Sequence, residues 1–116
     1  MKTKEDIYNT IEALKSELIT SSEIDDVVID GLTTLNKLRN LYKEDRTLFD
    51  PHLVQELQNL KKSIESIDEC SELIYDDFSK HNCKELQRIK AVIPQNEYLL
   101  SLIDEKIKQF EQNEYD

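Results

Sequence analysis

The chain has 116 residues, of which 25 are Asp or Glu and 15 are Lys or Arg, so its formal net charge is −10. This length suits one domain, and its single glycine argues against a β-sandwich, a phosphate-binding loop or a dinucleotide-binding fold, all of which need glycine-rich turns. The acidic balance argues against direct binding to nucleic acid, because the phosphates would repel the chain.

Two helices are predicted in the first part of the chain, over residues 4–19 and 23–43. Thr3 is placed to cap the first of them, and Ser22 is placed to cap the second. Apolar residues recur along one face of the first helix at spacings of four, three and four, namely Ile7, Ile11, Leu14 and Leu18.

The helix over 23–43 carries a wide apolar stripe of nine residues, so we expect it to contact two neighbouring helices. Gly31 lies inside this helix, where glycine costs about 1 kcal/mol relative to alanine. We interpret Gly31 as a point of close packing against a crossing helix, with a kink as the alternative.

A third helix is predicted over residues 51–92. Asp50 can accept hydrogen bonds from the free amides of the first turn, and Pro51 suits the first helical position. A heptad seam then follows at alternating spacings of four and three, through Leu53, Leu57, Leu60, Ile64, Ile67, Ser71, Ile74 and Phe78. No Gly or Pro lies between 52 and 93, which favours one continuous helix; a break near 79–82 is the alternative, because Lys80-His81-Asn82-Cys83 has no large apolar residue.

The last helix is predicted over residues 95–112, with short connections throughout. Short connections favour antiparallel neighbours. We therefore predict an all-α fold: a single antiparallel, up-and-down bundle of four helices, or five if the third one breaks, with one long helix of coiled-coil character.

No catalytic, metal-binding or cofactor-binding motif occurs in the chain. His81 and Cys83 are two residues apart, so a helix points them to different faces, and Cys70 borders the seam and should pack there. His81, Cys83 and Asp77 are too few ligands for a structural zinc site. We therefore expect no enzyme, no metal and no cofactor.

Charge is segregated along the predicted long helix. Six acids and no base lie between Ser63 and Ser79, and Lys80, Lys84 and Arg88 follow at spacings of four. A continuous helix would be a rod with an acidic half and a basic half; the alternative is ordinary solvation with pairing inside the chain. Charges beside a heptad seam can set partner choice. The predicted partner-binding residues are Leu57, Leu60, Ile64, Glu65, Ile67, Glu69, Glu72, Ile74, Asp76, Phe78, Lys80, Lys84 and Arg88.

A continuous third helix would be about 63 Å long, whereas the first and last helices would each span about 25 Å and leave part of the seam uncovered. This predicts a non-enzymatic interaction subunit or adaptor of a multiprotein complex, and in size and pattern the chain resembles small acidic coiled-coil subunits. The alternative is a self-contained acidic bundle that acts as an inhibitor, immunity protein or chaperone.

The predicted partners are proteins, in a hetero-complex rather than a homodimer, with no small-molecule ligand evident. Two cysteines are too few for a disulfide framework, and no apolar stretch reaches the roughly 18 residues of a membrane span. We therefore expect no membrane insertion and an intracellular protein, in the cytoplasm or the nucleus.

Overall fold

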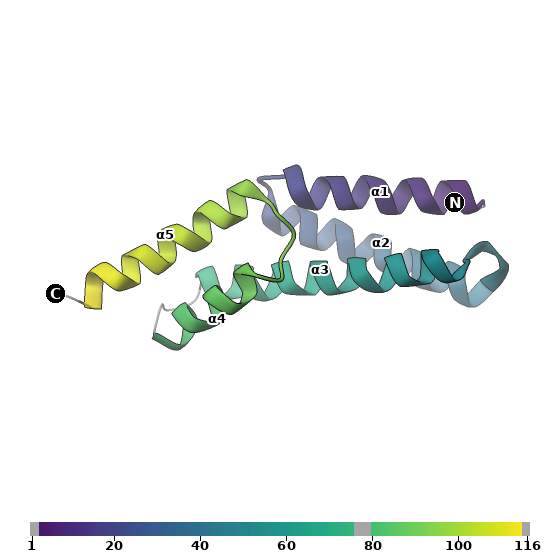
Figure 1. Ribbon diagram of the computed structural model, residues 1–116. Helices are drawn as coiled ribbons and strands as arrows, with labels where there is room; N and C mark the ends of the chain where they lie inside the picture. Colours follow the sequence, from purple (N-terminus) through teal and green to yellow (C-terminus); the bar gives the residue numbers. More distant parts are fainter. Residues whose placement is uncertain (1–2, 76–79, 115–116) are drawn as a thin grey trace.

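The computed structural model describes residues 3–75 and 80–114, which form an elongated bundle of 60 × 22 × 20 Å (Figure 1). In these residues the chain is all-α, without strands. The elements in chain order are α1 (Lys4–Thr20), α2 (Ile24–Glu44), the short 3-10 helix η1 (Arg46–Leu48), α3 (Pro51–Tyr75), α4 (Lys80–Lys90) and α5 (Glu97–Glu114).

The helices form two groups along the length of the molecule. Helices α1, α2 and α3 run up and down beside one another and contact each other pairwise (Figure 1). Helices α4 and α5 pack together at the far end, and both also contact α3. The wide stripe of α2 indeed contacts two helices, α1 and α3, as its pattern predicts.

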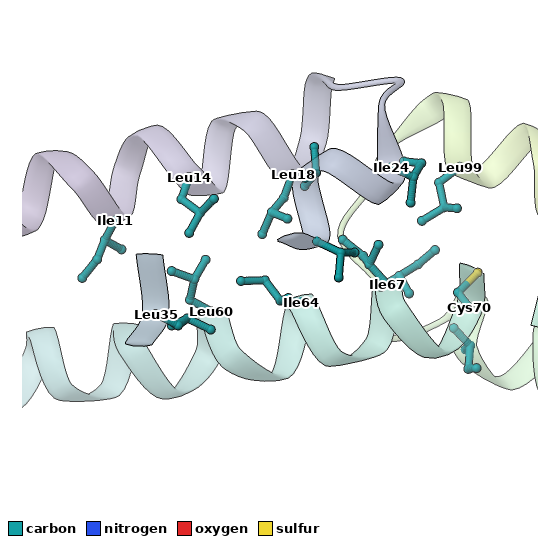
Figure 2. Packing of buried hydrophobic residues seen from close by; sticks show 14 of the residues in the cluster. Ile11, Leu14, Leu18, Ile24, Leu35, Leu60, Ile64, Ile67, Cys70 and Leu99 are labelled. Carbon is teal, nitrogen blue, oxygen red and sulfur yellow. The ribbon is translucent and has the colours of Figure 1, made fainter. Parts of the chain in front are cut away.

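The core is built mainly from the predicted apolar stripes, although Ile29 and Leu32 of the α2 stripe are 62% and 42% exposed. Ile7 and Ile11 of α1 are fully buried, as are Ile64 and Ile67 of α3, each at most 1% exposed. In Figure 2 the side chains of α1 point toward those of α3. Burial of this kind contributes roughly 1.5–3 kcal/mol per large apolar side chain, which is the main stabilising term of the bundle.

Side-chain caps fix most of the helix starts. The Thr3 hydroxyl accepts a hydrogen bond from the Asp6 amide at 3.1 Å, and the Asp50 carboxylate accepts one from the Leu53 amide at 2.8 Å, both as predicted. The predicted cap of the second helix is wrong, although the helix itself lies where it was expected. Its N-cap residue is Glu23, whose side chain makes no capping hydrogen bond, and Ser22 is not the cap.

A buried asparagine joins the two groups of helices. Asn96 is 2% exposed, and its Oδ1 accepts a hydrogen bond from the Leu99 amide at 3.0 Å, which caps α5. Its Nδ2 donates to the carbonyl oxygens of Leu18 at 3.0 Å and Ser21 at 2.8 Å. These carbonyls lie at the end of α1, where they have no partner in their own helix. One side chain therefore forms the hydrogen bonds that a backbone amide at the start of α5 and two carbonyl groups at the end of α1 need.

Gly31 lies where α2 and α3 approach most closely. A Cβ atom at this position would lie 2.7 Å from Ile64 Cδ1 and 3.2 Å from Ile64 Cγ1. The interpretation of Gly31 as a close-packing residue is thus confirmed, and its φ is not positive, so backbone freedom is not the reason for the glycine.

The prediction of one continuous helix over 51–92 is wrong. In a straight helix Glu69 and Arg88, 19 residues apart, would be about 28 Å apart. Instead, Arg88 Nη2 lies 3.2 Å from Glu69 Oε1. Helix α3 ends at Tyr75, α4 begins at Lys80 after residues that lie outside the described part of the chain, and α4 runs back alongside the end of α3 (Figure 1). The physical reason is burial: Leu86 and Ile89 of α4 are 0% and 1% exposed, whereas a straight helix would extend past the bundle and leave them in water.

Candidate protein-interaction groove

The predicted seam is buried inside the chain's own core. Leu60, Ile64, Ile67 and Ile74 are at most 6% exposed, and Leu57 is half-buried. Helix α1 covers the first part of α3 and α5 covers its last part (Figure 1). The expectation of an uncovered seam is therefore wrong for the described residues, because α1 and α2 pack on the first part of the shorter α3, and α4 and α5 pack on its last part.

The predicted charged residues partly pair within the chain. Arg88 bridges Glu69 at 3.2 Å and Glu85 at 2.8 Å, and Glu65 lies 3.8 Å from Lys61. The structure thus has no rod with an acidic half and a basic half: the reversal brings the basic α4 against the acidic end of α3.

The remaining predicted residues are not gathered into a site. Glu72 and Lys84 are exposed. Asp76 and Phe78 lie outside the described residues, and Lys80 begins α4 but its side chain is not among those described.

The structure instead shows a groove between α2 and α3, near the end of the molecule where α2 leads into α3. Its volume is about 430 Å³. The apolar part of its lining comes from Leu35 and Tyr42 of α2 and from Val54 and Leu57 of α3. Its charged rim consists of Arg39, Lys43, Arg46 and Lys61, and Gln58 completes the wall.

The rim cations are held in place by local structure. Arg39 and Lys43 are four residues apart, so they lie on the same face of α2. Arg46, in η1, places its guanidinium 5.5 Å from the centre of the Tyr42 ring, and that ring packs edge-on against the buried Phe49 at 5.3 Å. Lys43 lies in the last turn of α2, where the helix dipole favours positive charge.

Three of these cations have no acidic partner. Among the side chains that the structure describes, no carboxylate forms an ion pair with Arg39, Lys43 or Arg46. Lys61 has only the long, exposed contact with Glu65 at 3.8 Å. A protein with ten excess negative charges thus carries a local positive rim around an apolar groove, which suits a ligand that is both apolar and acidic.

Sequence reasoning found only one residue of this groove, Leu57. A signal was present: Arg39, Lys43 and Arg46 follow one another at spacings of four and three along the edge of the apolar stripe of α2. That spacing places three cations on one face but does not show which helix lies opposite. The groove also needs Val54 and Leu57 of α3, and only the packing of α2 on α3 brings them together.

Both cysteine side chains are buried. Burial raises the pKa of the Cys70 thiol to about 11, with a smaller contribution from the neighbouring Glu69 charge. Such a thiol is not a nucleophile at neutral pH. No group of three His, Cys, Asp or Glu side chains that could hold a metal ion occurs in this part of the chain.

None of the described helices combines the length and the apolar character that a membrane span requires. Comparison with known proteins gives no relative: no family model, no curated protein and no solved structure matches this chain.

Proposed function

We propose that this chain is a non-enzymatic interaction subunit that binds a partner protein through the groove between α2 and α3. The observation that carries the proposal is the combination of an open apolar lining with three cations, Arg39, Lys43 and Arg46, that form no ion pair with a carboxylate of the described residues. Interaction sites of this kind have an apolar centre and a polar rim. The partner is a different protein, so the assembly is a hetero-complex.

The groove replaces the heptad seam as the basis of the proposal. The seam residues are engaged in the core, so exposing them would unfold the bundle. Leu57 is different, because it packs on the core with one side and lines the groove with the other. A partner seated on Leu57 and Val54 would cover apolar surface without disturbing the residues that hold the fold.

A second candidate function is that of a self-contained bundle which inhibits, protects or chaperones its target. The internal coverage of the stripes of α1, α2 and α3 supports it, because such proteins fold without a partner. Both candidates bind protein. A folded monomer that melts cooperatively before any partner is added favours this second candidate, whereas a chain that is stabilised strongly by its partner favours a subunit.

The proposal is tested by photo-crosslinking from the groove. A benzophenone amino acid is placed at Gln58, which is exposed in the groove, and in a matched control at Gln87, which is exposed on α4. In an extract of the cells from which the protein comes, we expect a discrete crosslinked product from position 58 and none from position 87. The product should disappear in the Arg39→Glu/Lys43→Glu background. Absence of a product from position 58, or an equal product from both positions, would overturn the groove as the binding site.

A further inference from the structure

The chemistry of the groove also indicates what binds there. We infer that its occupant is an amphipathic α-helix with about two turns seated in the groove, apolar on one face and flanked by Asp and Glu, supplied by a partner protein. This inference rests on the proposed function and specifies the partner's binding element.

The walls of the groove favour a helix over an extended segment. Both walls are helices, so their backbone N–H and C=O groups are already bonded within α2 and α3. An added strand would find no backbone partners on such walls, and its own groups would lose water without compensation. A helix satisfies its own backbone and needs only side-chain packing from the groove.

The dimensions set the length of that helix. The α2 wall runs from Leu35 to Lys43. Eight residue steps at 1.5 Å give about 12 Å, which corresponds to about two turns. The α3 wall runs from Val54 to Lys61 and spans about 10 Å by the same rise. We therefore expect anchors at i, i+3 or i+4, and i+7 on the bound helix.

The charges of the rim determine the flanks of the bound helix. Arg39, Lys43 and Arg46 line the α2 side, and Lys61 lines the α3 side. The acidic residues of the occupant should therefore be denser on the flank that faces α2. A polyphosphate ligand such as nucleic acid does not fit, because Leu35 and Leu57 would lie under its charged backbone and the whole chain carries −10.

The test is a selection from a displayed library of helical peptides. The library fixes an apolar stripe of about two turns and randomises the flanks among Asp, Glu, Lys, Arg and Ser. Selection uses the full wild-type chain, with counter-selection against the Arg39→Glu/Lys43→Glu variant. A Lys37→Glu/Lys108→Glu variant is the control, since both of these lysines are exposed away from the groove and the charge change is the same.

We expect the enriched peptides to carry a net acidic flank. One of them, made synthetically, should become helical on binding and lose about tenfold in affinity between about 0.05 M and 0.5 M salt. Binding should fall about tenfold or more in the groove variant and stay within about twofold in the control. Circular dichroism of the three free proteins checks that all are folded.

Four results would overturn the inference, and the first three concern the selected peptides. These are enrichment of neutral or basic flanks, binding without induced helix, or no enrichment that depends on Arg39 and Lys43. A fourth is a concentration-dependent dimer in sedimentation that the groove variant abolishes, because the occupant would then be a second copy. In the first two cases a crosslink from Gln58 can still occur, so the proposed function would stand while the helical acidic occupant would not.

Discussion

The contact between Gly31 and Ile64 allows a quantitative test of the packing between α2 and α3. Alanine at position 31 gains about 1 kcal/mol in helix propensity. Its Cβ would lie 2.7 Å from Ile64 Cδ1, and Ile64 is 0% exposed, so its methyl group cannot turn away without displacing neighbours. Overpacking of this kind costs about 1–3 kcal/mol. We therefore expect Gly31→Ala to lower the free energy of unfolding by up to about 2 kcal/mol.

The same substitution should have the opposite sign once the methyl group is removed. Ile64→Val alone costs about 0.5–1.5 kcal/mol. In this background the contact at 2.7 Å is gone, and only the milder one at 3.2 Å remains. Gly31→Ala should then stabilise the Ile64→Val protein by up to about 1 kcal/mol. The effect of Gly31→Ala should therefore differ between the two backgrounds by at least about 1 kcal/mol, which is the coupling between the two sites.

A double-mutant cycle measures this coupling. Urea unfolding of the four proteins is followed by circular dichroism at constant protein concentration, with the m-values compared to check that the transition is the same. A Gly31→Ala effect that is equal in the two backgrounds within about 0.5 kcal/mol would refute the argument. So would a stabilisation by the full propensity term when Ile64 is intact, because the two helices would then be farther apart than described.

Three further predictions concern other parts of the molecule. Asn96→Ala should lower the free energy of unfolding by about 2 kcal/mol. Asn96→Asp should be nearly as unstable, because a carboxylate keeps the cap of α5 but cannot donate to the two carbonyl groups. Chemical denaturation of both variants measures these changes. Leu60→Ala should lower the free energy of unfolding by about 2–5 kcal/mol, because Leu60 is buried in the core. Leu57→Ala should lower it clearly less, leave the fold intact and weaken binding of the acidic helix in a fluorescence titration. Equal losses of unfolding free energy would contradict the placement of Leu57 at the groove. The buried Cys70 thiol should reduce stability above pH 9, because the unfolded chain loses the thiol proton near pH 9 and the folded chain holds it to about pH 11. The free energy of unfolding should therefore fall more steeply with pH for the wild type than for Cys70→Ala. Parallel curves for the two proteins would exclude the raised pKa.

Most of the secondary structure follows from local patterns in the sequence. The stripe from Ile7 to Leu18 and the wide stripe of α2 indicate amphipathic helices wherever they pack, because helical periodicity depends only on residue spacing. Thr3 and Asp50 mark helix starts for a similarly local reason, since each caps amides within three residues. Even Gly31 shows its role, because a glycine inside an otherwise strong helix needs a packing reason.

The reversal after α3 could not be derived in this way. The segment from Leu53 to Ile89 has helical periodicity and no internal Gly or Pro, so local propensity is satisfied equally by one long helix and by two shorter ones. The choice depends on whether Leu86 and Ile89 meet water or the core, and that depends on where α3 and α5 lie. The same reversal turns segregated charge into the Glu69–Arg88 pair.

Composition and residue spacing therefore predict an acidic, all-α chain, the faces that its helices bury for the most part, and the caps at Thr3 and Asp50. Helix packing is needed to show that the heptad seam is internal and that an open apolar groove lies between α2 and α3. The physical reason is that a stripe specifies which side of a helix is buried, whereas a groove is shared by two helices. The cations of α2 and the apolar side chains of α3 form one site only because the two helices pack side by side.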